Sequence, residues 1–308
     1  MIRVENLTKR YGDLVAINKV SFQVKRGEIL GFLGPNGAGK TTTMRIITAY
    51  MPPTEGTVHI ADFNVAENPI EAKRQIGYLP ENPPLYNDMT VYGYLDFVAD
   101  IKGVSRKDKK KRIDLAMEKC GIVDVKKRLI GNLSKGYRQR IGIAQAIVHD
   151  PAIIVLDEPT IGLDPKQIIE IRELIKNLSG ERTVILSTHI LPEVTMTCTR
   201  VAIINEGRIV LEESLDKLSE KVQTAQNLFL KINHWDREVI DKILSIPAVS
   251  GVDESSSGEF IIEPKDGADI REDLSRMVVE NGWGMLEMRP ITHTLEDVFL
   301  RVISTEGE

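Results

Sequence analysis

The sequence predicts an α/β fold in which a parallel sheet carries a glycine-rich turn, followed by a small α+β domain. An apolar run at 27–33 leads into the turn, and a helical pattern begins at Lys40. Two more apolar runs, 152–156 and 183–188, have the composition of strands buried on both faces of a parallel sheet. From about residue 220 onward, strand and helix patterns alternate in a second, separate order.

Composition limits the class of protein. The chain has 308 residues, enough for one large domain or two smaller ones. Its formal net charge of −5 argues against bulk affinity for nucleic acid or anionic lipid, although a local patch could provide either. Cys120 and Cys198 are the only cysteines, so neither a disulfide framework nor a thiolate metal site is expected. No apolar run approaches the roughly 20 residues of a membrane span, and the first residues lack a signal peptide's apolar core. We therefore expect a soluble, cytoplasmic protein.

The first strands are predicted to form an antiparallel sheet. Strand-like runs cover 2–8 and 14–24, with a turn at 11–13, and a further run covers 57–60. Tyr11 in the turn is either a surface residue or a ring that stacks on a base, and its position alone favours the surface residue.

The glycine-rich turn matches the phosphate-loop pattern, in which a strand ends in a loop and a helix begins at Lys40 and Thr41. Its glycines let backbone N–H groups converge on phosphate oxygens, and the helix N-terminus adds partial positive charge. Lys40 would reach the β- and γ-phosphates, and Thr41 would bind Mg²⁺. A chance match is the alternative, expected in roughly one chain in a hundred of this length. The predicted nucleotide site consists of Gly34, Pro35, Asn36, Gly37, Ala38, Gly39, Lys40, Thr41 and Thr42.

A proline-rich segment at 78–86, which contains Glu81, is predicted to be an irregular loop because proline cannot donate to a strand ladder. Its mixture of polar and apolar side chains suits a buried turn or a docking surface. The helical patterns that follow form an insert at about 89–145. We interpret its basic run at 102–112 as a solvated helix face rather than a phosphate or lipid site.

A second chemical cluster begins at Leu133 and opens a helix at 141–148. Ser134 is a plausible N-cap, which alone would explain it, although the N–H groups of a helix start could also bind an anion. The buried-type strand that follows ends in Asp157 and Glu158. Ligands sit at the carboxyl ends of strands in open α/β sheets, so Asp157 is predicted to hold Mg²⁺ and Glu158 to accept a proton from attacking water. A polar turn after a strand is the alternative.

The remaining motifs of this domain follow in order. Asp164 is explained as an N-cap, with Pro165 at the first position of the next helix. The strand at 183–188 ends in His189, which would point at the same face as the two carboxylates and is predicted to contact phosphate. A hairpin at 201–211 closes the domain.

The last stretch predicts a ferredoxin-like domain, because its elements follow the order β-α-β-β-α-β. We therefore divide the chain into domains at 1–219 and 220–308. The second domain carries no catalytic constellation. A regulatory role, a dimer contact and a structural appendage are the alternatives for it.

Together these motifs resemble the ATP-binding subunits of ABC transporters. A phosphate loop, a helical insert, Leu-Ser-x-Gly, a strand ending in Asp-Glu, Gly-Leu-Asp and a strand ending in His occur in the family's order within residues 1–215. The segments 78–86 and 294–300 resemble the exporter (ABC-2 type) branch, and within it gliding-motility-type subunits. The resemblance implies a P-loop NTPase core of ABC ATPase type, with an antiparallel β subdomain and a helical insert.

The resemblance also implies a role for each motif. It assigns adenine stacking to Tyr11, and phosphate and Mg²⁺ binding to Gly34 through Thr41. Asp157 would be the carboxylate that binds the metal, Glu158 the catalytic base, and His189 the contact to the γ-phosphate. Ser134 and Gly136 would contact the γ-phosphate held by the opposite subunit, and Asp164 would lie in the loop that crosses between subunits.

Two departures from the family pattern are visible. Lys135 and Tyr137 replace the usual glycine and glutamine of the Leu-Ser-x-Gly motif, although its serine and second glycine remain. Glu81 stands where the family commonly has a glutamine that senses Mg²⁺ and the attacking water. A carboxylate can still accept a hydrogen bond from a metal-bound water, so Glu81 is placed with both the catalytic groups and the metal ligands.

The implied mechanism is that two ATP molecules join two such subunits, identical or different, and that hydrolysis lets the pair open. Separate membrane permease subunits would dock on the helical insert and the 80–90 loop, which places the chain on the cytoplasmic face of the membrane. Two alternatives come from other classes: a soluble ABC-type ATPase acting on ribosomes or DNA, and a non-catalytic nucleotide-dependent tethering protein. The first would show linked ATPase halves, a long coiled coil or a basic surface, and this sequence has none, so no nucleic-acid partner is expected.

Overall fold

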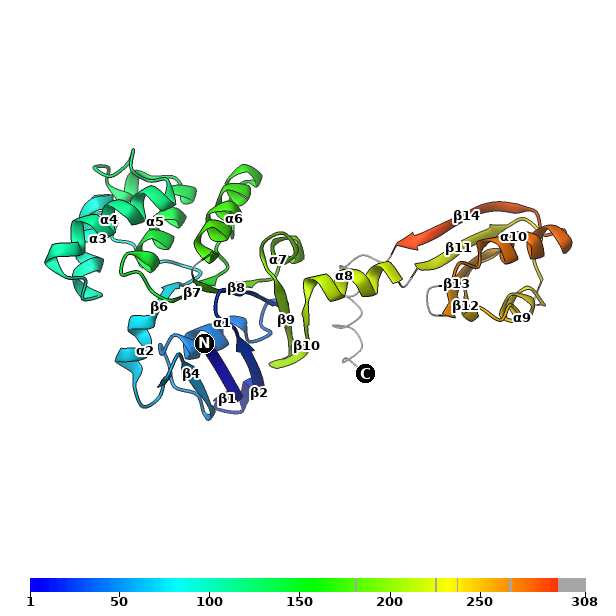
Figure 1. Cartoon of the computed structure of the whole chain (residues 1–308), viewed down its shortest axis with the longest axis horizontal. Coiled ribbons are helices and arrows are strands. Elements are labelled where there is room, and N and C mark those ends of the chain that lie inside the picture. The colour runs from blue at the N-terminus through cyan, green and yellow to red at the C-terminus, as the bar shows by residue number, and fades with distance from the viewer. Residues whose placement is uncertain (181, 225, 237, 266–267, 293–308) are drawn as a thin grey trace. The chain divides into compact units, whose positions relative to one another are not determined.

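The computed structural model describes residues 1–292 except 181, 225, 237 and 266–267 (Figure 1). The chain divides into two compact units, Met1–Leu215 and Asp216–Glu308. The segment 294–300, which contributes to the resemblance to the exporter branch, lies outside the described residues.

The larger unit is built on a six-stranded sheet with the strand order β10-β9-β3-β8-β7-β6. Neighbouring strands are parallel except for the hairpin of β9 and β10, which confirms the predicted parallel core and its closing hairpin. The strands are β3 (Ile29–Leu33), β6 (Ile76–Leu79), β7 (Ile153–Asp157), β8 (Thr183–Thr188), β9 (Arg200–Asn205) and β10 (Arg208–Ser214).

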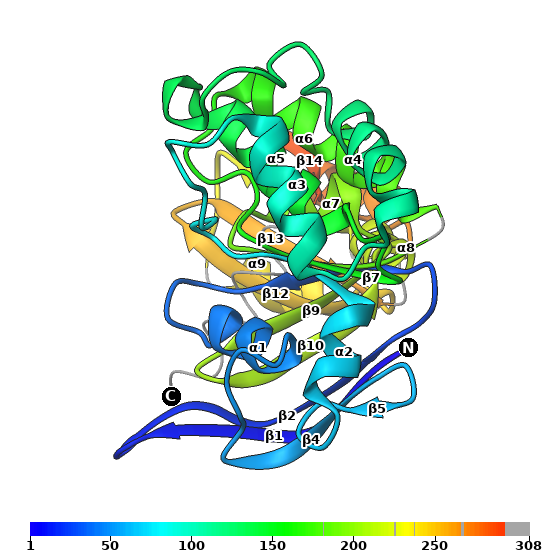
Figure 2. The same cartoon turned by 90° about the vertical axis from the view of Figure 1, so that its left-hand side faces the viewer.

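Both faces of this sheet are buried, as the apolar strands predict. In β7, Ile154 and Leu156 belong to the hydrophobic core between the sheet and helices α3 to α6. Ile153 and Val155 belong to a second core on the opposite face of the sheet. Figure 2 shows α3 to α6 over one face, and α1 with a smaller sheet over the other. Because side chains alternate along a strand, one run of apolar residues fills both cores.

The smaller sheet of this unit is antiparallel, as predicted, with the strand order β2-β1-β4-β5. Its strands are β1 (Ile2–Tyr11), β2 (Leu14–Val24), β4 (Glu55–Ile60) and β5 (Phe63–Asn64). Tyr11 is therefore the last residue of β1, paired with Leu14, and not part of the turn itself.

Some helix starts in the larger unit carry a side-chain cap, whereas the predicted N-cap Ser134 makes no cap hydrogen bond. The side chains of Thr90, Ser105 and Asp164 each accept a hydrogen bond from a backbone N–H in the first turn of the helix that follows. The cap at Asp164 and the first helical position of Pro165 were predicted. The helices of the larger unit are α1 (Lys40–Ile47), α2 (Pro69–Gln75), α3 (Val91–Ile101), α4 (Arg106–Cys120), a 3₁₀ turn (Ile130–Asn132), α5 (Lys135–Ile147), α6 (Pro165–Ser179) and α7 (Leu191–Thr197). Helix α8 (Leu215–Thr224) begins at the last residue of this unit and belongs otherwise to the smaller one.

Some expectations about local structure were wrong. Tyr78 and Leu79, which were assigned to the irregular loop, are the last two residues of strand β6. The strand depends on its pairing with β7, and a run of four residues is too short to reveal this pairing in the sequence. The helix after Ser134 begins at Lys135 and not at Ile141. Helices α2 and α7 have seven residues each, too few for a clear apolar period, and were not predicted.

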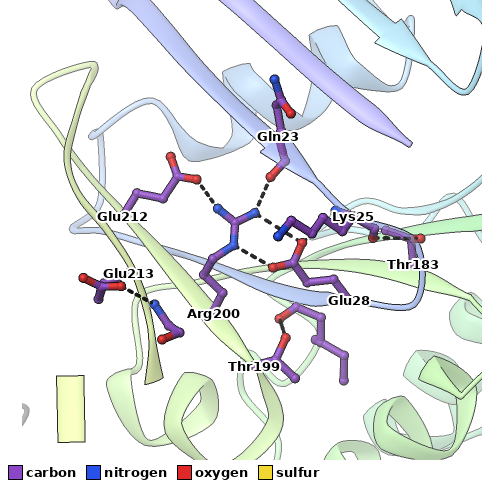
Figure 3. A network of polar contacts seen from close by, with 10 residues as sticks. Gln23, Lys25, Glu28, Thr183, Thr199, Arg200, Glu212 and Glu213 are labelled. Atoms are coloured by element: carbon purple, nitrogen blue, oxygen red, sulfur yellow. Dashed lines mark hydrogen bonds and ion pairs between the residues drawn. The ribbon is translucent and has the colours of Figure 1, made fainter. Parts of the chain in front are cut away.

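An arginine joins the edges of both sheets (Figure 3). Arg200 on β9 donates from Nε to Oε1 of Glu28 at 2.6 Å and from a terminal nitrogen to Oε2 at 3.2 Å. It also contacts Glu212 on β10 and the backbone carbonyl of Gln23 on β2. Burial raises the pKa of Glu28, but the hydrogen bonds from Arg200 and from the Lys25 backbone outweigh it and leave the pKa below its usual value.

The smaller unit has the predicted β-α-β-β-α-β order and a four-stranded antiparallel sheet with the strand order β12-β13-β11-β14, a ferredoxin-like arrangement. Its core contains Leu230, Phe260 and Leu274, which are fully buried. The elements are β11 (Gln226–Ile232), α9 (Glu238–Leu244), β12 (Val249–Ser256), β13 (Glu259–Pro264), α10 (Arg271–Glu280) and β14 (Met285–Thr292). Within the described part of the chain, no helix combines the length and apolarity needed to cross a membrane.

Candidate functional site

The glycine-rich turn lies between β3 and α1, and Asn36 and Gly37 at its tip are exposed. Gly37 and Gly39 have positive φ values of 82° and 104°. A Cβ at Gly39 would lie 2.7 Å from the carbonyl oxygen of Ala16, so that position requires glycine. No side chain caps α1 and no acidic residue lies in its first turn, which leaves its N-terminal N–H groups free for an anion.

A cavity of about 360 Å³ opens beside this turn. It is lined by Ala16, Asn36, Gly37, Gly39, Lys40, Thr41, Thr42, Glu81, Glu158 and Ile161. Most of these residues were predicted from their motifs. Ala16 and Ile161 were not, because an alanine on a strand and an isoleucine in a loop carry no chemical signal.

Lys40 is held inside this cavity. It is 6% exposed, and its ammonium group donates to the carbonyl oxygens of Gly34 at 2.8 Å and Pro35 at 3.1 Å. The same ammonium lies 3.5 Å from Oε1 of Glu158. A cation fixed at the helix start, beside free N–H groups, suits polyphosphate oxygens.

Asp157 ends β7 and is completely buried. Its Oδ1 accepts a hydrogen bond of 2.7 Å from Ser187 Oγ, while its Oδ2 has no hydrogen-bond partner among the described residues. Burial raises the pKa of Asp157, the hydroxyls of Ser187 and Thr41 oppose that rise, and the charge of Glu81 adds to it. Ser187 was not predicted, although a polar residue inside an apolar strand is a usable signal.

This donor set fits Mg²⁺. A buried carboxylate oxygen without a partner, a threonine hydroxyl and a second carboxylate are hard oxygen donors. The described residues contain no group of three or more His, Cys, Asp or Glu side chains able to hold a metal by themselves. Mg²⁺ commonly uses one or two carboxylates together with phosphate oxygens and water, so a smaller protein set suffices.

Glu158 lies between a lysine and a histidine. Its Oε2 is 2.9 Å from Nδ1 of His189, and its other oxygen faces Lys40. Burial raises the pKa of Glu158, and the neighbouring His189 and Lys40 oppose that rise. Its φ of 49° is rare for a residue other than glycine and costs on the order of 1 kcal/mol, which is typical of functional positions. A carboxylate with a raised pKa beside a phosphate-type cavity can act as a general base.

Other predicted site residues lie outside the described lining of this cavity. Tyr11 is 44% exposed, with its hydroxyl 3.1 Å from Met51 Sδ and the Lys9 ammonium 5.5 Å from its ring centre. Ser134 has the predicted N-cap position of α5, but its side chain makes no cap hydrogen bond. Asp164 bonds the backbone N–H of Gln167 at 3.0 Å.

Gly136 is tightly packed at the start of α5. A Cβ there would lie 2.6 Å from the side-chain oxygen of Gln167 on α6, so a larger residue would displace that contact. The two departures at this helix start have identifiable neighbours. Tyr137 donates its hydroxyl to Asp124 at 2.8 Å, and the Lys135 ammonium occupies the space that a Cβ on Gly162 would take.

Known proteins resemble this chain in sequence over nearly its whole length. The family model described as ABC transporter matches residues 17–161. The bacitracin transport ATP-binding protein BcrA of Bacillus licheniformis is 36% identical over 305 residues, covering 98% of this chain and 97% of that protein. The ABC transporter ATP-binding protein NatA of Bacillus subtilis is 35% identical over 238 residues, covering 75% of this chain and 97% of that protein.

Solved structures agree with the sequence relatives. An ATP-binding subunit of an ABC transporter matches with a TM-score of 0.65 and 30% identity, covering 72% of this chain and 92% of that one. A dimeric ATP-binding cassette in a post-hydrolysis state, bound to ADP and Pi, matches with a TM-score of 0.63 and 28% identity, covering 70% and 99%.

Proposed function

Since the chain belongs to the ATP-binding subunits of ABC transporters and is an ATPase of that family, we propose that it hydrolyses Mg²⁺-ATP at the cavity beside Lys40. Glu158 is the general base in this proposal. The single observation that carries the proposal is the convergence of a buried lysine, two buried carboxylates and a histidine at one end of the parallel sheet. The finer assignment to gliding-motility-type subunits stays a prediction.

The roles follow from the geometry of the cavity, except that of Tyr11, which lies outside the lining and is assigned by the family resemblance alone. The N–H groups of the turn and Lys40 bind the phosphates, and Tyr11 stacks on adenine. Asp157, Thr41 and Glu81 would hold Mg²⁺, which would supply charge neutralisation on the phosphate oxygens when bound. Glu158 takes a proton from water, and His189 both orients that carboxylate and contacts the γ-phosphate.

A second ATP-binding subunit completes the site in this proposal. The exposed Ser134 side chain, which makes no cap hydrogen bond, and the N–H groups at the start of α5, where Gly136 is buried against Gln167, are the donors for the γ-phosphate held by the other subunit. The loop around Asp164 crosses between the two subunits. The dimeric structural relative supports this arrangement. It also explains why Ser134 and Asp164 lie outside the lining of the cavity in their own chain.

We place the permease contact on the segment after β6 and on α3. Tyr86 and Phe97 are 53% and 39% exposed, and their ring centres lie 5.8 Å apart. Exposed aromatic residues in contact are typical of protein interfaces. The permease is a separate membrane protein, and the chain is peripheral on the cytoplasmic face. The names of the relatives support transport over the alternative of ribosomes or DNA.

The test is Glu158→Gln in the full chain. We expect the turnover number to fall by about 10²- to 10⁴-fold, because an amide cannot accept the proton, while ATP affinity is retained and ATP traps a dimer on size-exclusion chromatography. Glu118→Gln, on the exposed side of α4, is the matched control and keeps wild-type turnover. Hydrolysis by Glu158→Gln at the wild-type rate would overturn the assignment of the base.

A further inference from the structure

A buried carboxylate lies outside the proposed machinery. Glu193, in the first turn of α7, is 1% exposed. Among the described residues it makes no ion pair with a lysine, arginine or histidine. Burying a carboxylate without a cationic partner is unfavourable, because it gives up its hydration. Its presence here therefore needs a reason.

Its partners are two threonine hydroxyl groups. Thr160 Oγ1 donates to Oε1 of Glu193, and Thr188 Oγ1 donates to Oε2 at 2.6 Å. The threonines are 3% and 0% exposed. One carboxylate thus accepts a hydrogen bond with each oxygen, from two different segments of the chain.

Those two segments carry the proposed base and its histidine. Thr160 stands two residues after Glu158, in the loop after β7, and Thr188 stands directly before His189, at the end of β8. The same segments meet a second time where Glu158 Oε2 and His189 Nδ1 lie 2.9 Å apart. Two bridges therefore join the end of β7 to the end of β8, one facing the cavity and one buried behind it.

The buried bridge is also tied to neighbouring backbone. Thr188 Oγ1 accepts from the N–H of Ile190 at 3.1 Å, which orients the chain immediately after His189. The carbonyl oxygen of Thr188 accepts from the N–H of Gly34, the first residue of the glycine-rich turn, at 3.4 Å. A shift of Thr188 would move the histidine relative to both the base and the phosphate turn.

We propose that Glu193 is a positioning residue that sets the separation of Glu158 and His189 through Thr160 and Thr188. The inference depends on the proposed roles of Glu158 and His189. It differs from a purely structural role, in which the carboxylate only satisfies two buried hydroxyl groups. A misplacement of about 1 Å in catalytic groups can reduce a rate by about 100-fold.

The test changes the threonines first, because Glu193→Ala can fail to fold. In Thr160→Val a methyl group replaces the hydroxyl at similar volume, whereas Thr160→Ser keeps the hydroxyl. Thr197→Val is the control from the same helix as Glu193, since Thr197 is 5% exposed and its hydroxyl has no hydrogen-bond partner among the described residues. Steady-state ATP hydrolysis and thermal unfolding are measured on each full-length variant.

We expect kcat to fall by about 10- to 100-fold in Thr160→Val, with KM within about 2-fold of wild type. Thr160→Ser and Thr197→Val should keep kcat within about 2-fold. Equal kcat values in Thr160→Val and Thr197→Val, with only the melting temperature lowered, would overturn the inference. So would a matching loss of kcat in Thr160→Ser.

A second readout does not depend on turnover. In NMR spectra of protein with isotope-labelled histidine, the ring signals of His189 are assigned by their loss in His189→Gln. The chemical shifts of these signals should change in Thr160→Val and in Glu193→Gln but not in Thr197→Val. Unchanged His189 signals in the first two variants would contradict positioning. The failures are separable: normal hydrolysis by Glu158→Gln defeats the proposed base, whereas an inactive Glu158→Gln with a fully active Thr160→Val defeats only this inference.

Discussion

Lys40 and Glu158 face each other across the cavity, with Nζ of Lys40 3.5 Å from Oε1 of Glu158 and side chains that are only 6% and 7% exposed. The ammonium proposed to bind phosphate therefore contacts the carboxylate proposed to activate water. In the proposed mechanism, phosphate oxygens entering the cavity would compete with Glu158 for this ammonium. ATP binding would then also free the proposed base from Lys40.

Replacing Lys40 by Ala should weaken ATP binding itself. Loss of a charge-assisted contact to phosphate costs about 1.5–3 kcal/mol, which corresponds to an increase of about 10- to 100-fold in the dissociation constant measured by calorimetry. Lys127→Ala, an exposed lysine outside the cavity, is the control. Equal affinities of the two variants would show that Lys40 does not bind the nucleotide.

Glu81→Gln tests the metal site. The Glu81 carboxylate lies close enough to Asp157 to raise its pKa, so the two negative charges together should attract a divalent cation. Without the Glu81 charge, we expect the Mg²⁺ concentration for half-maximal hydrolysis to rise by about 10-fold. Titration with Mg²⁺ at saturating ATP measures this, with Glu118→Gln as the control. An unchanged or lower Mg²⁺ requirement would remove Glu81 from the ligand set.

Glu28→Gln tests the junction held by Arg200. Because the folded protein lowers the pKa of Glu28, the ionised pair stabilises the larger unit above the ordinary pKa of 4.5, and this stabilisation is lost as pH falls through the lower, folded value. We expect the variant to be less stable by about 2 kcal/mol at about pH 7, and the difference to shrink below about pH 4.

The chain provides an internal control for this measurement. Both tryptophans, Trp235 and Trp283, lie in the smaller unit. The circular-dichroism transition of the larger unit should move in Glu28→Gln, while the tryptophan fluorescence transition should stay unchanged. A constant difference in stability across the pH range would rule out the charge of Glu28 as its cause.

Tyr86→Ala tests the permease surface. Truncating a central aromatic side chain weakens an interface by about 2 kcal/mol or more. We therefore expect the amount of the variant that co-purifies with the membrane permease to fall by at least about 10-fold, while ATP binding stays at the wild-type level. Tyr50→Ala is the matched control, since Tyr50 is 72% exposed on a different part of the same unit. Equal recovery of both variants would place the docking surface elsewhere.

Much of the site could be predicted because its signals are local. The glycine-rich turn and the polar residues that end β7 and β8 each follow a buried strand, and parallel strands bring their carboxyl ends to one edge of the sheet. Short elements were harder. Strand β6 has four residues and needs β7 as a partner, and helix α2 buries only Ala72.

The sequence by itself indicated the family, through the order of its motifs within residues 1–215, and the residue types at the cavity, because each motif is a local run of residues. Only the tertiary structure decided which atoms meet: Lys40 with Glu158, Glu158 with His189, and Glu193 with Thr160 and Thr188. Thr160 and Glu193 are 33 residues apart, and no periodicity or propensity relates side chains at that separation. Their contact exists because β7 and β8 are neighbours in a buried sheet, where most polar groups find a hydrogen-bond partner inside the protein.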